Sequence, residues 1–303
     1  MELNENADID TSQVEDRRGS GGGGGLGGLP IGGGGLVGTI ITVILLVVGG
    51  YFGVNTLSGD DSGSGDNKDI QQECADKSQA TEKLVCRNVL FVNSIQAYWE
   101  KASPEYFGRP YQKATTVIFS NQVSTGCGAA DSGVGPFYCP ADDKVYIDLT
   151  FYRVLAKQLG APGEFAQPYV LAHEYGHHMQ DLIGTEAKMR RAQQGASNKE
   201  KNQLSVRLEL QADCYAGAWA KAASDTTDAN GQRIFKSLTA QDVQEGIDTA
   251  GKIGDDELQE RSGNPVNPAE FTHGTAAQRQ KWFSQGYNSG NPTSCDTFAA
   301  GSL

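Results

Sequence analysis

The sequence predicts an α+β protein that is mostly helical, with a small sheet, preceded by one transmembrane helix. Three observations predict this class. Apolar residues at helical spacing recur through most of the chain after residue 73, whereas only two short segments, 117–119 and 145–147, are typical of strands. One long apolar segment near the N-terminus carries no charge. The roughly 230 residues from 73 to 303 are enough for one sizeable core.

The first 57 residues predict that the chain is anchored in a membrane. Residues 1–35 form an acidic and then glycine-rich stretch, which we expect to be a disordered cytoplasmic tail. Residues 36–57, from Leu36 to Leu57, are long and apolar enough to cross a lipid bilayer, since about 20 residues suffice. A secretory signal peptide is the alternative, but the long preamble and the lack of an A-x-A cleavage site disfavour it.

The charges that flank this segment predict its orientation. Arg17 and Arg18 precede it, and Lys68 is the one basic residue that closely follows it, which places the N-terminus in the cytoplasm. Residues 58–72 are a flexible linker, and residues 73–303 are the folded domain. The sequence therefore predicts a single-pass protein of the inner membrane, with that domain in the periplasm or outside the cell.

Cysteine usage supports this orientation. All six cysteines follow the apolar segment, and an oxidising compartment would pair them. Proximity in the sequence suggests the pairs Cys74–Cys86 and Cys127–Cys139, which leaves Cys214–Cys295. A cysteine-based zinc site is the rival interpretation, but the chain contains no C-x-x-C pair.

The domain begins with helices expected near 73–101 and 149–159, with the two strands between them. The segment Val145–Asp148 follows a turn at residues 140–144, and its alternation of apolar and polar residues suits an edge strand. Peptides bind along such edges by strand addition, so Tyr146 is a candidate for substrate binding. The alternative is an ordinary strand that makes no substrate contact.

A helix expected over residues 168–183 carries the most specific motif. It contains His173, Glu174 and His177 in the order H-E-x-x-H. Residues four apart share one face of a helix, so both histidines can bind one metal ion. Glu174 lies at the adjacent edge, where it can deprotonate a metal-bound water. The alternative is a helix that carries two histidines by chance.

The third metal ligand should come from a later helix, expected over residues 198–223. Glu209 and Asp213 share a face of it, so Glu209 is the candidate ligand and Asp213 the acceptor for the free ring N–H of a ligating histidine. The alternative is an exposed acidic pair. His178, Asp181 and Glu186 are weaker candidates, and a third histidine six residues after His177 is absent because Ile183 stands there.

The combined pattern resembles the bacterial neutral zinc metallopeptidase family. The stretches that carry the resemblance are 172–181, 209–217, 135–142 with 145–148, and 272–275 with Arg279, Trp282 and Phe283. The N-terminal glycine-rich stretch and apolar segment are also similar to the family's layout. The resemblance implies a membrane-anchored, Zn²⁺-dependent peptidase with a zincin-like fold, acting on a peptide or protein substrate.

The fourth histidine, His273, precedes a helix expected over residues 275–286, with Thr275 and Gln278 as a capping box and Gly286 as its end. A further helix is expected at 240–252. In peptidases with two histidines and a glutamate, another donor often stabilises the oxyanion, and His273 is the candidate for it. Tyr175 and Tyr146 are alternatives, and an ordinary loop histidine is equally compatible with the sequence.

These observations predict a metalloendopeptidase that hydrolyses peptide bonds with a zinc-activated water. A non-catalytic binding or assembly factor of the cell envelope, with a structural zinc site, is the alternative. The net charge of −12 offers no electrostatic footprint for nucleic acid.

Overall fold

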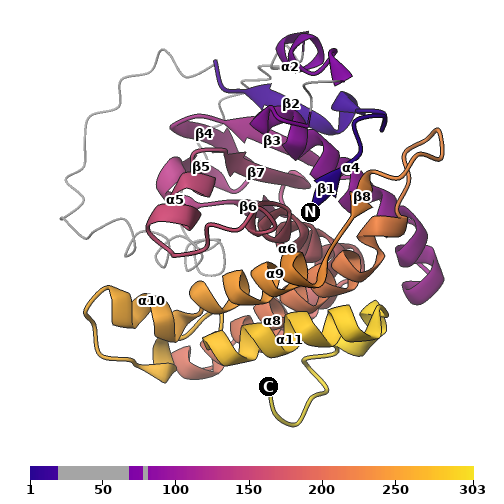
Figure 1. The fold of residues 1–303 in the computed structure, drawn as a ribbon. Coiled ribbons are helices and arrows are strands. Elements are labelled where there is room, and N and C mark those ends of the chain that lie inside the picture. Colours follow the sequence, from indigo (N-terminus) through magenta and orange to yellow (C-terminus); the bar gives the residue numbers. More distant parts are fainter. Residues whose placement is uncertain (20–67, 78–80) are drawn as a thin grey trace.

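The computed structural model describes residues 1–19, 68–77 and 81–303. Within these residues the fold is mostly helical with small sheets, so the predicted α+β class is confirmed (Figure 1). The helices are α2 (Lys68–Glu73), α4 (Leu84–Ala102), α5 (Phe151–Lys157), α6 (Ala166–Leu182), α7 (Thr185–Gln193), α8 (Asn198–Ala222), α9 (Ala240–Lys252), α10 (Asp255–Arg261) and α11 (Ala276–Ser289). The strands are β1 (Glu2–Leu3), β2 (Val14–Arg17), β3 (Thr115–Phe119), β4 (Gln122–Thr125), β5 (Gly128–Asp131), β6 (Phe137–Cys139), β7 (Lys144–Asp148) and β8 (Phe235–Ser237).

The main sheet has the strand order β2-β3-β7-β6. Strands β2, β3 and β7 run parallel, and β6 pairs antiparallel with β7. One face of the sheet, with Ile118 and Ile147, joins the large helical core. The other face, with Val117, Phe119 and Tyr146, packs in a smaller apolar cluster with Val123 of the β4–β5 hairpin.

The predicted edge strand 145–148 was therefore placed wrongly. It lies within β7, which has β3 on one side and β6 on the other. The alternation of apolar and polar residues reflects two differently packed faces of an internal strand, and both of those faces are buried. In this sheet the edge next to the helices of the site is β6.

The helices are stacked in layers beside the sheet. Helix α6 contacts β6 and β7 and also packs on α8, and α8 in turn packs along α11, which also contacts α9 (Figure 1). Glycines permit the close crossings. A Cβ on Gly286 of α11 would lie 1.8 Å from the carbonyl oxygen of Cys214, and one on Gly217 of α8 would lie 2.0 Å from that of Phe283.

Several helix ends have capping residues of the expected types. Ser197 caps α8 and Thr275 caps α11, each with a complete capping box. Helix α6 ends at Leu182, and Gly184 follows it in a left-handed conformation with φ of 78°. Gly286 does not end α11, which continues to Ser289 and stops at Gly290. Glycine is present at 286 because α8 approaches closely, so the predicted end was wrong.

The N-terminal residues belong to the folded domain. Strand β2 pairs with β3 in parallel, and β1 pairs with β8. The N-terminal ammonium of Met1 forms a buried ion pair with Asp242 in the first turn of α9. The predicted disordered tail was therefore wrong for residues 1–19, while the rest of it, residues 20–35, lies outside the described residues.

The predicted single-pass membrane topology is also corrected. Among the residues that the structure describes, no helix is long and apolar enough to cross a bilayer. The predicted span at residues 36–57 lies outside them. Moreover, residues 14–17 and 115–119 are neighbouring strands of one sheet. Paired strands lie about 4.8 Å apart, so these two segments cannot lie on opposite sides of a membrane.

All three predicted disulfides are present: Cys74–Cys86, Cys127–Cys139 and Cys214–Cys295. The first joins α2 to α4, and the second fastens the tip of the β4–β5 hairpin to β6. The third ties the C-terminal segment to the middle of α8.

Candidate metal centre and active site

Two adjacent helices bring the predicted metal ligands together. His173 and His177 lie on α6, and Glu209 lies on α8 where the two helices cross. Gly176 permits this crossing, because a Cβ there would lie only 3.0 Å from Cα of Ala212. The small residue on α6 thus sets the distance from the two histidines to the carboxylate on α8.

The three donor groups form a compact triangle. The Nε2 atom of His173 lies 3.2 Å from Nε2 of His177 and 3.1 Å from Oε2 of Glu209. Nε2 of His177 lies 3.5 Å from Oε1 of Glu209. Ligands at the 2.0–2.1 Å typical of zinc in a tetrahedron are about 3.3 Å apart, so the triangle matches one face of such a site. A zinc ion fits this donor set.

The outer nitrogen of each imidazole already has an acceptor. Nδ1 of His173 lies 2.8 Å from Oδ1 of Asp213, and Nδ1 of His177 lies 2.8 Å from Oε1 of Gln180. With the ring proton on Nδ1 in both cases, both Nε2 lone pairs converge on the carboxylate of Glu209. Such an arrangement requires a cation.

The charge environment agrees with this requirement. Burial disfavours the charged form of His177, but the carboxylate of Glu209 outweighs it and raises the pKa of His177 to about 10. Burial likewise opposes ionisation of Glu209, yet the nearby His177 and His273 hold its pKa well below the usual range. Without a metal the site therefore binds protons, because the carboxylate favours positive charge beside it. A metal cation that displaces these protons would be favoured for the same reason.

Asp213 is held in a buried network of its own. Besides His173, its carboxylate accepts hydrogen bonds from the Tyr169 hydroxyl at 2.6 Å and from Nε and Nη2 of Arg279 at 2.8 and 3.0 Å. Burial would raise its pKa, but Arg279 and His173 lower it. Asp213 is fully buried and stays ionised, as an acceptor for the Nδ1 proton of His173 should.

Gln180 orients the other histidine. Its amide nitrogen donates to the carbonyl oxygen of Leu208 at 2.7 Å and to Oε1 of Gln211 at 3.2 Å, which turns its own oxygen toward His177. The amide of Gln211 donates to the carbonyl oxygen of Cys295 at 3.0 Å. The Cys214–Cys295 disulfide thus helps to fix a chain of amides that ends at His177.

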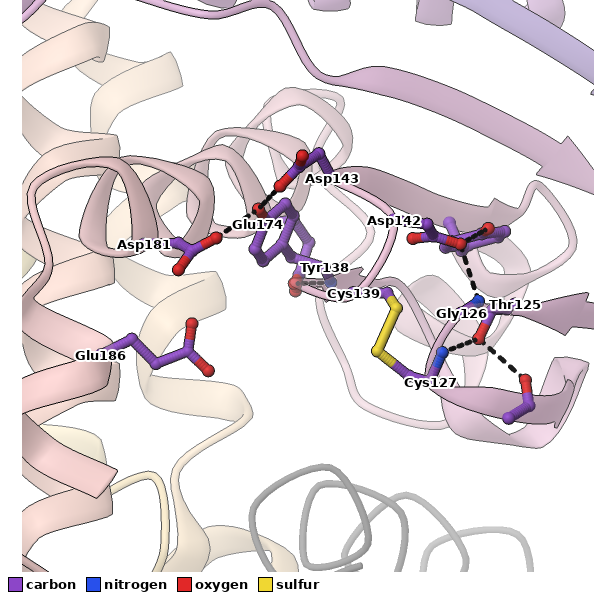
Figure 2. The surroundings of a disulfide bond; sticks show 12 residues. Thr125, Gly126, Cys127, Tyr138, Cys139, Asp142, Asp143, Glu174, Asp181 and Glu186 are labelled. Atoms are coloured by element: carbon purple, nitrogen blue, oxygen red, sulfur yellow. Dashed lines mark hydrogen bonds between the residues drawn. A yellow bond between two sulfur atoms is a disulfide. The ribbon is translucent and has the colours of Figure 1, made fainter. Parts of the chain in front are cut away.

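Glu174 lies beside the metal ligands without joining them. Its Oε2 atom accepts a hydrogen bond of 2.9 Å from the backbone N–H of Tyr138 in β6. Figure 2 shows this contact next to the Cys127–Cys139 disulfide, with Asp143 and Asp181 on either side of the Tyr138 hydroxyl. Burial raises the pKa of Glu174, while the two histidines and the Tyr138 N–H act against this rise.

His273 is a buried member of the same pocket. Asp255 accepts the backbone N–H groups of Thr272, His273 and Gly274, and its Oδ1 lies 3.1 Å from Nδ1 of His273. The opposite ring nitrogen, Nε2, has no hydrogen-bond partner among the described residues although it is buried. His273 lines the same pocket as His173, Glu174, His177 and Glu209.

The remaining candidates lie elsewhere or play other parts. Tyr146 is buried on the far face of the sheet, where its hydroxyl donates to Asp142 at 2.6 Å. Tyr175 is buried against Thr116 of β3. Neither residue lines the pocket. His178 bonds the carbonyl oxygen of Gln112 and packs on Tyr138, while Glu186 lines one end of the pocket.

Three residues of this site were not among those predicted for it, although Gln180 and Arg279 belong to the stretches that carry the family resemblance. Gln180 and Arg279 lie on predicted helices, and helical spacing from His177 and His273 does not by itself select them. Asp255 begins α10, a short polar helix that apolar periodicity does not reveal. An acidic residue in the first turn of a helix is common, so Asp255 gave no reason to connect it to His273.

Comparison with known proteins agrees with this geometry. Residues 4–298 match the model of a family described as "Putative neutral zinc metallopeptidase". The chain is 43% identical over 293 residues to "Uncharacterized protein YpfJ" of Escherichia coli (strain K12), covering 95% of this chain and 96% of that protein. It is 46% identical over 233 residues to "Uncharacterized protein Rv2575" of Mycobacterium tuberculosis (strain ATCC 25618 / H37Rv), covering 76% of each.

No solved structure matched the chain. The family match begins at residue 4 and so includes strand β2 as well as every residue of the site. The chain therefore belongs to this neutral zinc metallopeptidase family.

Proposed function

We propose that the protein is a zinc-dependent metalloendopeptidase. The observation that supports this most strongly is the combination of three ligand atoms that fit one face of a zinc tetrahedron with a separate carboxylate beside them. A metal held by His173, His177 and Glu209 would have three protein ligands from the described residues, and all three line one pocket. Bound zinc would polarise a peptide carbonyl and lower the pKa of a water to about 7.

Glu174 is the proposed general base. Its Oε2 is held by the Tyr138 N–H, which leaves Oε1 to accept the proton of the attacking water. The same oxygen then passes the proton to the leaving amine. The raised pKa that burial gives Glu174 suits a group that must both take up and release a proton.

His273 is the proposed oxyanion donor. The Thr272 hydroxyl lies 3.1 Å from Nδ1 of His273 and can donate to it, so the ring can carry its proton on Nε2, toward the pocket. This nitrogen is buried and has no hydrogen-bond partner among the described residues. Leaving a buried polar atom unpaired costs free energy, unless a ligand forms the missing hydrogen bond. An oxyanion formed from the peptide carbonyl would be such a partner.

The geometry disfavours a non-catalytic factor with a structural zinc site. Structural zinc is normally enclosed by four protein ligands. Here three ligands converge among the described residues, and Glu174 is held away from the triangle by a strand of the sheet. A structural site has no need of this second, separately positioned carboxylate.

Two adjacent histidines allow a matched test. In the full-length protein, His177→Ala should abolish both zinc binding, measured by metal analysis after dialysis, and hydrolysis of casein or a peptide library. The control is His178→Ala, which also removes an imidazole. His178 bonds the carbonyl oxygen of Gln112 and is not one of the proposed ligands, so this variant should retain zinc. Full zinc occupancy in His177→Ala would disprove the ligand assignment.

A further inference from the structure

The pocket at the metal site extends into an apolar chamber. Besides the ligands and Glu174, its walls include six apolar residues: Val134, Phe137, Phe151, Leu159, Val170 and Leu258. Each of them has less than a tenth of its surface exposed. They come from the segment leading into β6, from α5 and the residues after it, from α6 and from α10.

The chamber lies to one side of the metal ligands along α6. Val170 precedes His173 by three residues, so it lies on nearly the same face, about 4.5 Å nearer the helix N-terminus. Glu186 lies beyond the opposite end of α6. The pocket therefore passes the metal ligands, and Val170 belongs to the part of its wall on their N-terminal side.

The polar groups in the pocket wall are already engaged. Tyr169 and Arg279 are bound to Asp213, and Glu186 pairs with Arg190 at 2.5 Å. His273 Nε2 is the one buried side-chain atom of the wall, within the described residues, that lacks a partner. A charged group entering the apolar part would lose its hydration without gaining an opposite charge.

We propose that this chamber is the substrate's specificity subsite and that it takes a bulky apolar side chain next to the scissile bond. This inference rests on the proposed peptidase function and names its substrate class. A peptide whose carbonyl carbon is attacked beside Glu174 would then place one flanking side chain against these walls. Leu, Ile, Met or Phe would bury its surface there, whereas Asp, Lys or Gly would not.

The position of Gly135 supports a chamber that is shaped for a ligand. Its φ of 81° is a left-handed conformation, and a Cβ there would lie 3.2 Å from Cε2 of Phe151. The residue thus allows the chain ahead of β6 to pass close to the aromatic ring and to complete the wall. Both Gly135 and Phe151 line the pocket.

The test is a cleavage profile of the zinc-loaded full-length protein on a peptide library. We expect Leu, Ile, Met or Phe at one of the two positions that flank the cleaved bond. Peptides with Asp, Lys or Gly at that position should have a kcat/KM lower by about tenfold or more. Cleavage with no apolar preference at either flanking position would overturn the inference while leaving the proposed function intact.

Two leucines near α5 provide matched variants. Leu159→Ala enlarges the chamber and should raise the kcat/KM ratio of a Phe peptide over a Leu peptide by about tenfold. Leu155→Ala removes the same atoms from a buried residue that does not line the pocket, and it should leave this ratio unchanged. Equal shifts in both variants would contradict the assignment of the chamber.

A binding measurement separates failure of the inference from failure of the proposed function. Zinc-loaded Glu174→Gln protein should bind fluorescent peptides with the same order of preference, as read by anisotropy. If the wild-type protein cleaves no peptide, the peptidase proposal fails. The subsite would still stand if apolar peptides bound about tenfold more tightly than Asp or Lys peptides, and would fall if they did not.

Discussion

Two acidic residues on α8, four positions apart, make different contacts in this site. Glu209 presents its oxygens to both histidine Nε2 atoms, whereas Asp213 contacts only the outer nitrogen of His173. We expect Glu209→Gln to lose zinc, since a neutral amide is a poor ligand. Asp213→Asn should retain zinc with an affinity about 10–100-fold lower, as measured by chelator competition.

Asp213 also has a structural part that the spacing did not predict. Its replacement leaves Arg279 buried without a counter-charge, which typically costs about 3–5 kcal/mol of stability. Adding Arg279→Met to Asp213→Asn should recover much of that stability but not the zinc affinity. If Asp213→Asn lost its zinc while Glu209→Gln kept it, the two roles would have to be exchanged.

At this scale the sequence predicted which side chains come together at the candidate site and little of what surrounds them. His173, Glu174, His177, Glu209 and Asp213 were found because their spacings are those of one helix face. Tyr146 was chosen on the assumption of an edge strand, and the internal position of β7 removes it from the site. Contacts between distant segments, such as Asp255 with His273, leave no periodic trace.

The crossing of α6 and α8 determines the geometry of the metal site. Gly176→Ala would place a Cβ 3.0 Å from Cα of Ala212 and force the helices apart. We expect a reduced zinc affinity, because Glu209 then moves away from the histidines. Chelator competition, with the variants compared at the same folded fraction, measures the zinc affinity. Adding Ala212→Gly to Gly176→Ala should restore part of that affinity. An unchanged affinity in Gly176→Ala would show that the crossing does not control the site.

The junction of α10 with residues 272–274 should respond to acid. Burial would raise the pKa of Asp255, but His273 and the backbone N–H groups hold it below its ordinary value of 3.8. A carboxyl group whose pKa is lower in the folded than in the unfolded state stabilises the folded protein. This stabilisation is complete at pH values above the unfolded pKa, and it is lost as the pH falls through the folded pKa.

We therefore expect Asp255→Asn to lower the free energy of unfolding near neutral pH and to weaken its dependence on pH below 3.8. Urea unfolding at several pH values measures both effects. Glu260→Gln, on the exposed side of the same helix, is the control and should match the wild type. A pH dependence identical in Asp255→Asn and the wild type would exclude this contribution.

Some elements escaped prediction for physical reasons. The sequence of β2 is Val-Glu-Asp-Arg, and only Val14 is buried, because β2 is an edge strand. Helix α10 is too short and polar to show apolar periodicity, and α7 is likewise a short, polar helix. Gly286 was interpreted as a helix end, although glycine also serves where two helices touch. The long helices, by contrast, carry their own caps and periodicity.

The whole molecule is organised around segments far apart in the sequence. Residues 1–18 complete the sheet and contact α9, the disulfide at Cys295 supports the amides behind His177, and the family match spans residues 4–298. A fragment that starts at residue 70 would lack two strands. Functional measurements therefore require the full chain.

The central claim is that a metal held by α6 and α8 works together with Glu174. The direct test is Glu174→Gln in the zinc-loaded full-length protein, with zinc content and peptide hydrolysis measured on the same sample. Since Glu174 is the proposed base and not a proposed ligand, we predict about one zinc per chain and a loss of hydrolysis of at least about 100-fold. Retained zinc with unchanged turnover would contradict the proposed mechanism.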